Sequence, residues 1–319
     1  MREALQGMAA FLRPRTISTC VSQSRKAERD MELKSKFFSA REVQERVTCI
    51  SGMGGVNCYL VEGTERAALI DGLAGAGSLK AFVRELTELP VVVLNTHGHV
   101  DHIGVDFEYG EAYIHPDDIG LLYEHADREM RYGYARGSMR HAPEGFTLRM
   151  DDVVPSCAIK TFPLSEGQCF DLGGTVLETI CVPGHTRGTV VFLDRATHTL
   201  FSGDACNVST LLYGKEATSI ERYRESLVHL KGYQSAFDVM YGGHGFGPEQ
   251  NVLVDEAIEL CDEIMAGTDD AVPAVGIQGQ PCWYAKEKDE RFCRLDGKRA
   301  NIAYAKDRIW QRDIEDACK

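Results

Sequence analysis

The stretch Thr96-His97-Gly98-His99-Val100-Asp101-His102 is the most informative part of this sequence for its fold class. It directly follows the run Val91–Leu94, which is short, apolar and rich in valine, so we expect a buried strand there. Three imidazoles and one carboxylate then leave the end of this strand in a single loop. Imidazole nitrogens and carboxylate oxygens bind zinc at about 2.0 to 2.2 Å, and such a loop can bring them to one point. The spacing therefore predicts a metal site.

Three further candidate ligands stand where later strands are expected to end. They are His185 in Pro183-Gly184-His185-Thr186, Asp204 in Ser202-Gly203-Asp204, and His244 in Gly242-Gly243-His244-Gly245. The flanking glycines allow the backbone to approach a metal ion closely. These residues and the first loop together form one set of candidate ligands.

The order of these motifs resembles the metallo-β-lactamase superfamily. The pattern is H-x-H-x-D-H, then P-G-H-T, S-G-D and G-G-H, with Asp71 upstream in Leu69-Ile70-Asp71-Gly72, and it covers roughly residues 47 to 265. The resemblance implies an α/β fold, the αββα sandwich with two similar halves. By motif position it implies these ligands: His97, His99 and His185 for a first metal ion, Asp101, His102 and His244 for a second, and Asp204 as a bridge between them.

The resemblance also implies a role for Asp71, which would hydrogen-bond the metal loop and fix the orientation of its ligands. Loss of such support typically costs about 10- to 100-fold in metal affinity or activity. Tyr213, in Leu211-Leu212-Tyr213-Gly214 just after the bridging aspartate, is a candidate hydrogen-bond donor to an oxyanion or a leaving group. A packed aromatic side chain is the alternative for Tyr213.

Two zinc ions in this arrangement predict a metal-dependent hydrolase. Two ions about 3.5 to 4 Å apart share a water and lower its pKa to about 7, so a hydroxide is available to attack a carbonyl. We expect Asp101 to orient that hydroxide, Asp204 to bridge the ions, and the substrate to be a small ester, lactone or thioester. Iron or manganese stays open as the metal, because histidine and carboxylate ligands accept several divalent ions.

The bridging Asp204 argues against the true β-lactamases of the superfamily, whose corresponding position is usually not a bridging aspartate. The pattern is closer to hydroxyacylglutathione hydrolases and bacterial lactonases, which cleave thioesters or lactones. Three alternatives remain: a phosphodiesterase on the same site, an iron-dependent oxidoreductase of the same fold, and a metal-binding scaffold without catalysis.

The composition narrows the class of partner. The chain has 35 Lys and Arg against 48 Asp and Glu, a formal net charge of -13, which disfavours nucleic acid and anionic membranes and favours a small-molecule substrate. Its 11 cysteines are scattered without a C-x-x-C pair, which indicates reduced thiols and a cytoplasmic location. An arginine-rich N-terminus leaves a transit peptide as an alternative. No run approaches the roughly 20 apolar residues of a membrane span, and the oligomeric state stays open.

We expect three segments along the chain. Residues 1–40 lack periodicity and predict a mobile extension, residues 41–266 form the catalytic domain, and residues 267–319 form a tail of short strands that packs on it. Within the catalytic domain, residues 117–155 are expected to be largely helical and are rich in tyrosine and arginine. This segment is either a lid over the site or a solvated helical region whose arginines pair with neighbouring acids.

Overall fold

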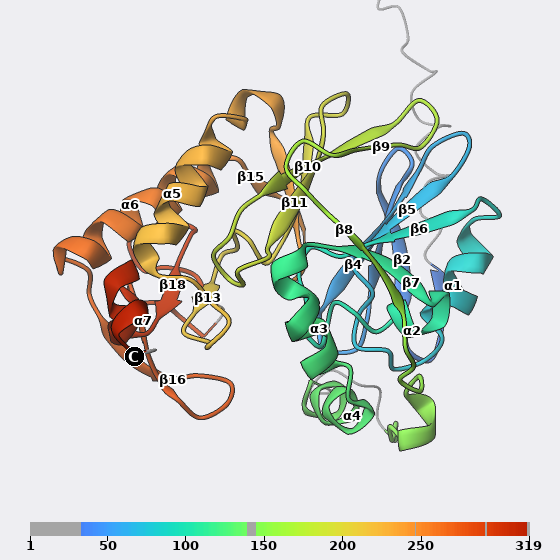
Figure 1. Ribbon diagram of the computed structural model, residues 1–319, viewed down its shortest axis with the longest axis horizontal. Coiled ribbons are helices and arrows are strands. Elements are labelled where there is room, and N and C mark those ends of the chain that lie inside the picture. The colour runs from blue at the N-terminus through green and yellow to red at the C-terminus, as the bar shows by residue number, and fades with distance from the viewer. Residues whose placement is uncertain (1–32, 139–144, 246, 291, 318–319) are drawn as a thin grey trace, which may run out of the picture. The chain divides into compact units, whose positions relative to one another are not determined.

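The computed structural model describes residues 33–138, 145–245, 247–290 and 292–317 (Figure 1). Within these residues the first sheet follows chain order: β1 (Leu33–Lys34), β2 (Ser39–Gln44), β3 (Val47–Ser51), β4 (Asn57–Glu62), β5 (Ala67–Ile70), β6 (Val91–Leu94), β7 (Glu111–Ile114) and β8 (Lys160–Pro163). The second sheet has the order β15 (Glu249–Gln250), β14 (Val239–Gly242), β12 (Thr199–Gly203), β11 (Val190–Asp194), β10 (Val176–Cys181) and β9 (Cys169–Asp171). A smaller sheet has the order β13 (Thr210–Leu212), β18 (Ile302–Tyr304), β17 (Pro281–Tyr284) and β16 (Val272–Val275).

The first and second sheets pack face to face, and helices cover their outer faces. Tyr59 of the first sheet packs against both Phe201 and Tyr241 of the second, at ring-centroid distances of 5.5 and 5.4 Å. Helix α1 (Leu79–Leu86) buries Phe82 and Val83 on the outer face of the first sheet. Helices α5 (Ile220–Lys231) and α6 (Val252–Ala266) pack on the outer face of the second (Figure 1). The layers therefore form the expected αββα sandwich.

Each half of the sandwich repeats one local topology. In the first half an antiparallel pair, β4 and β5, is followed by α1 and by β6, which lies parallel to β5. In the second half the antiparallel pair β11 and β12 is followed by α5 and by β14, which lies parallel to β12. Because parallel strands end at the same edge of a sheet, the residues after β6, β12 and β14 gather at one edge of the sandwich.

The first sheet begins earlier than the predicted boundary at residue 41. Leu33 pairs with Ala40, and both Phe38 and Ala40 are buried. Strand β1 has only two residues, and β2 has only Ala40 and Val43 as apolar residues, so neither shows the alternation by which a strand is recognised in sequence. Residues 1–32 of the expected mobile extension lie outside the described part of the chain.

The tyrosine- and arginine-rich segment folds into η1 (Pro116–Asp118), α3 (Ile119–His125), α4 (Arg128–Gly137) and η3 (Met150–Asp152), with residues 139–144 not described. The predicted arginine–acid pairing is wrong for Arg128 and Arg131. Both donate to backbone carbonyls, at 2.7 Å to Val153 and 2.7 Å to Val154 respectively. The planar guanidinium instead satisfies the carbonyl groups of the loop at residues 150–156. Whether the segment acts as a lid stays a prediction.

The C-terminal segment packs on the second half of the sandwich. Strand β18 pairs with β13, and Ile302 and Tyr304 enter the core that α5 and α6 cover. The remaining elements are α2 (Asp106–Tyr109), η4 (Gln234–Ala236), η5 (Lys306–Arg308) and α7 (Gln311–Ala317). None of the described helices combines the length and the apolar character needed to cross a membrane.

Candidate metal centre

The side chains of the predicted ligands converge at the edge of the sandwich where β6, β12 and β14 end. The loop after β6 contributes four of them, and the others follow β10, β12 and β14. Their ligating atoms form three groups, each with all atoms within 4.8 Å of one another: His97, His99 and His185; His97, His102 and Asp204; and Asp101, His102 and His244. We call the first of these groups the first triad and the last the second triad. All the predicted ligands are thus brought together.

Asp204 lies between the two triads. Its Oδ2 atom is 3.6 Å from His185 Nε2 in the first triad. In the second triad, the same oxygen is 3.8 Å from His102 Nε2 and 3.2 Å from His244 Nε2. Ligand atoms that bind one ion tetrahedrally at 2.0 to 2.2 Å lie about 3.3 to 3.6 Å apart. The carboxylate is therefore placed where it can serve both triads.

Two buried nitrogen atoms test whether the site fits a metal. His97 Nε2 and His102 Nε2 are inaccessible to solvent and have no hydrogen-bond partner among the described residues. A buried polar atom left unpaired costs about 1 to 3 kcal/mol, so it normally has a partner. A cation held by each triad would supply a partner for the nitrogen in that triad. The nitrogen and oxygen donors suit zinc, iron or manganese.

The ligands are held from behind, which leaves their other atoms facing the centre. Asp71, whose backbone is left-handed at a φ of 64°, lies 2.8 Å from His102 Nδ1 and accepts from the Thr96 amide at 2.8 Å. His185 Nδ1 donates to the Leu211 carbonyl at 2.7 Å. The contact between Asp71 and His102 orients His102 Nε2 toward the metal site.

Three supporting residues were not predicted from sequence. Glu216 Oε1 lies 3.3 Å from His99 Nε2, and the Tyr134 hydroxyl donates to Asp101 Oδ2 at 2.5 Å. Asp118 accepts from the amides of Gly98 and Gly188, at 2.9 and 2.8 Å, and so joins the loops that carry His99 and His185. None of the three stands in a motif, and the tyrosine-rich composition around Tyr134 was the only sequence signal.

Tyr213 does not join this cluster in the described structure. Its hydroxyl accepts from the Ile277 amide at 3.3 Å, and its ring packs against Gly276 in the hairpin between β16 and β17. The pairing of β13 with β18 carries the residue toward the C-terminal sheet. These contacts fit the packed aromatic side chain that was the alternative for Tyr213, and its role as a donor to an oxyanion stays a prediction.

The sequence comparisons agree with this architecture. The family model of the Metallo-beta-lactamase superfamily matches residues 51–244, which is more than half of the chain. The chain belongs to this superfamily. Two solved structures share its fold. A metallo-beta-lactamase from Pontibacter korlensis is 16% identical, with a TM-score of 0.52 over 70% of this chain and 97% of that one. A beta-lactamase domain protein from Burkholderia ambifaria is 20% identical, with a TM-score of 0.52 over 74% and 77%.

Two further proteins are similar to this chain in sequence. An uncharacterized protein of Mycobacterium leprae is 28% identical over 208 residues, which cover 61% of this chain and 88% of that protein. The acyl-coenzyme A thioesterase MBLAC2 of Gallus gallus is 29% identical over 158 residues, or 46% of this chain. The match spans 56% of the thioesterase, so little more than half of that enzyme's length is compared.

The two triads of this metallo-β-lactamase fold differ in charge. Burial lowers the pKa of His97 well below its ordinary value and lowers the pKa of His185 to about 4. Burial also works to lower the pKa of His102, but the carboxylates of Asp71 and Asp101 outweigh it and raise that pKa to about 9. Without a metal, two imidazoles of the first triad are therefore neutral, while the second triad holds a proton on His102.

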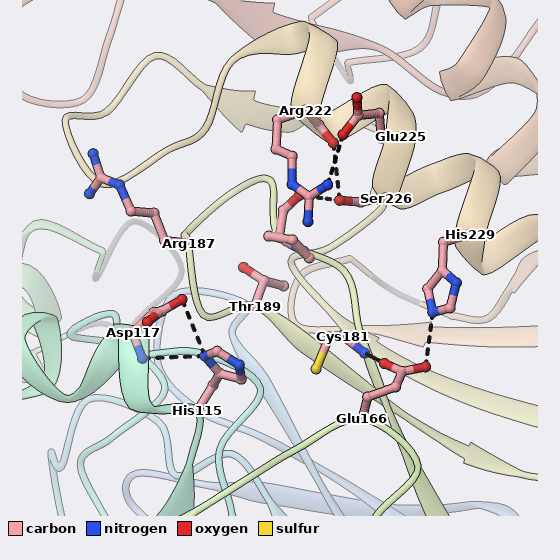
Figure 2. A pocket seen from close by; sticks show the side chains of 11 residues that line it. His115, Asp117, Glu166, Cys181, Arg187, Thr189, Arg222, Glu225, Ser226 and His229 are labelled. Atoms are coloured by element: carbon pink, nitrogen blue, oxygen red, sulfur yellow. Dashed lines mark hydrogen bonds and ion pairs between the residues drawn. The ribbon is translucent and has the colours of Figure 1, made fainter. Parts of the chain in front are cut away.

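A cavity beside the loop that carries His185 is a separate feature. It has a volume of about 540 Å³ and lies beside the loop of His185, but none of the predicted ligands lines it (Figure 2). Its charged groups are largely paired: Arg222 with Glu225 at 2.7 Å, and His229 with Glu166 at 2.9 Å. The metal centre therefore does not lie within this cavity.

Proposed function

We propose that the chain is a dinuclear zinc hydrolase that cleaves a small ester, lactone or thioester, with a thioester as the leading substrate. The observation that carries the proposal is the position of Asp204, whose Oδ2 lies within 3.2 to 3.8 Å of histidines from both triads. Similarity to the acyl-coenzyme A thioesterase MBLAC2 favours the thioester. Hydrolysis would add water across the carbon–sulfur bond and release a carboxylic acid and a thiol.

Zinc ions at this site would polarise the attacked carbonyl and lower the pKa of the attacking water to about 7. The residues of the chain would orient the reactants. Asp101 Oδ2 lies 3.4 Å from His244 Nε2, and the His244 side chain is 39% exposed. The second triad therefore lies at the more open side of the centre. A carboxylate there can accept a hydrogen bond from the attacking water and direct it at the substrate.

The net charge supports a small-molecule substrate, and the free cysteines support a cytoplasmic location. The net charge of -13 opposes a polyanionic partner, so we propose a small-molecule substrate and no nucleic acid. The buried thiols of Cys58, Cys206 and Cys261 are free, which supports a reducing, cytoplasmic environment.

The test combines metal content with substrate class. Protein purified without added metal would be analysed for its elements, then assayed on an acyl-coenzyme A, a lactone and a bis-phenyl phosphodiester, each with and without chelator. We expect two zinc ions per chain and chelator-sensitive cleavage of the thioester that added zinc restores. Iron without hydrolysis would overturn the proposal in favour of an oxidoreductase. Cleavage of the phosphodiester alone would favour a phosphodiesterase, and metal without any turnover a binding scaffold.

A further inference from the structure

The Tyr134 hydroxyl meets Asp101 at the oxygen that faces the second triad. It donates to Oδ2 at 2.5 Å. The same oxygen is 3.4 Å from His244 Nε2 and 3.8 Å from His102 Nε2. The hydroxyl is therefore at the candidate ligating atom itself, and it restricts how that carboxylate can turn.

Helix α4 is fixed on both sides of Tyr134. One turn earlier, Arg131 is fully buried and donates to Ser156 Oγ at 2.9 Å, with its guanidinium 4.5 Å from the centroid of the Phe107 ring. The next residue, Ala135, is buried in a cluster with Leu148. These contacts hold the helix and thereby hold the phenol against Asp101.

The source of this support sets Asp101 apart from His102 and from the contact that His185 makes through its Nδ1 atom. His102 is anchored by Asp71 at the end of β5, and His185 by the carbonyl of Leu211 in β13. Asp101 is anchored by a helix that follows β7 and lies outside the strands of the sandwich. The position of its carboxylate therefore depends on how α4 is packed.

We propose that Tyr134 is a positioning residue for the second metal ion, which it serves by holding the Asp101 carboxylate toward His102 and His244. This inference rests on the proposed function, because it requires the second triad to bind an ion. Partners that orient metal ligands typically contribute about 10- to 100-fold to metal affinity. The expected contribution is confined to one of the two ions.

Tyr132 offers a matched control on the same helix. Its hydroxyl donates to the Leu148 carbonyl at 3.4 Å rather than to a predicted ligand. Tyr132→Phe and Tyr134→Phe therefore each remove one phenolic hydroxyl from α4, and only the second removes a contact with the metal centre.

The experiment is a titration of metal-free wild type, Tyr134→Phe and Tyr132→Phe with zinc against a chromophoric chelator, repeated with cobalt(II) and read by its visible absorption. We expect wild type and Tyr132→Phe to bind two ions alike. Tyr134→Phe should bind the first ion as wild type does and the second about 10- to 100-fold more weakly. Excess zinc should then restore its thioester hydrolysis. Thermal unfolding of the metal-free proteins checks that all three are folded.

The outcomes separate this inference from the proposed function. If Tyr134→Phe binds each of the two ions with the same affinity as wild type does, the inference is wrong and the proposed hydrolase stands. Equal weakening of both ions would also overturn it, because the effect would then be general support rather than positioning of Asp101. If wild type binds fewer than two ions, the dinuclear site itself is wrong and the inference falls with it.

Discussion

The first and second triads consist of similar ligands but are supported differently. In the first, His97 is fully buried and His185 is 6% exposed. In the second, the His244 side chain is 39% exposed, and Asp101 is held by Tyr134 from outside the sandwich. The first triad is therefore preformed by the packed sheets, whereas the second depends on a helix and on an open edge.

This difference predicts unequal metal sites. A rigid set of ligands loses little freedom when it binds an ion, so the first triad should hold metal more tightly. The second triad should exchange its ion more readily and should lie nearer to the incoming substrate. Four changes would sharpen or break this comparison.

The largest effect is expected at Asp204, because it is shared by both triads. Asp204→Ala should abolish turnover and reduce the binding of both ions by more than the 10- to 100-fold typical of lost indirect support. The fold should persist, since this carboxylate lies at the edge of the core. Elemental analysis, thioester assays and circular dichroism would measure these effects. Near-normal turnover in a folded variant would exclude the shared-ligand mechanism.

The pH dependence of metal binding should differ between the triads. Asp71 and Asp101 raise the pKa of His102 to about 9 against the effect of burial, and the pKa of His244 is also raised, chiefly by Asp204 against the same effect. A metal must displace these protons, so the apparent affinity of the second triad should rise at least about tenfold per unit between about pH 6 and 8.

The first triad provides the internal control for this measurement. Burial keeps His97 neutral and lowers the pKa of His185 to about 4, so neither holds a proton that metal must displace in this range. Zinc competition titrations at several pH values should therefore give a shallow slope for the tighter ion and a steep one for the weaker. Equal slopes would contradict the difference in charge.

The next effect concerns the support behind His102. Asp71→Asn replaces the carboxylate, whose Oδ2 lies 2.8 Å from His102 Nδ1, with a neutral amide. One of the two terminal atoms of this amide, the nitrogen, is a hydrogen-bond donor and cannot accept from His102. We expect the second ion to bind about 10- to 100-fold more weakly, with a loss of about 1 to 3 kcal/mol in the free energy of unfolding of the metal-free protein. Zinc titration and urea unfolding would check both. A weaker affinity for the tighter ion alone would mean that Asp71 supports the first triad and not the second.

Sequence was most informative where the chemistry is local. Ser78 directly precedes α1, where serine is a favoured helix cap, and its Oγ accepts from the Ala81 amide at 3.1 Å. The strand at Val91–Leu94 and the ligands that follow it were likewise visible, because each ligand stands in a short motif beside a strand end. The order of motifs then implied the sandwich, which the packing of the two sheets confirms.

The residues that support the ligands could not be found in this way. Tyr134 and Glu216 reach Asp101 and His99 only through the packing of α4 and of the loop after β13, and neither belongs to a motif. Tyr213 was selected because it follows Asp204 closely in sequence, but the pairing of β13 with β18 takes its hydroxyl to Ile277. Proximity along the chain does not fix direction in space.

The smallest effect is expected at Glu216, the corresponding support in the first triad. Its Oε1 lies 3.3 Å from His99 Nε2, and its side chain is 20% exposed, so solvent can partly replace the contact. Glu216→Gln should weaken the tighter ion by at most about tenfold, the lower limit for lost indirect support, and leave the weaker ion unchanged.

Glu225→Gln is the matched control for this substitution, because it removes the same charge from an exposed pair with Arg222 that touches no predicted ligand. Both variants would be titrated with zinc beside wild type. If Glu216→Gln weakens the binding of the weaker ion, or if Glu225→Gln weakens zinc binding equally, the overall charge of the protein would account for the change in affinity. An effect on the tighter ion alone would mean that each triad is supported by its own residue, with Glu216 behind His99 and Tyr134 behind Asp101.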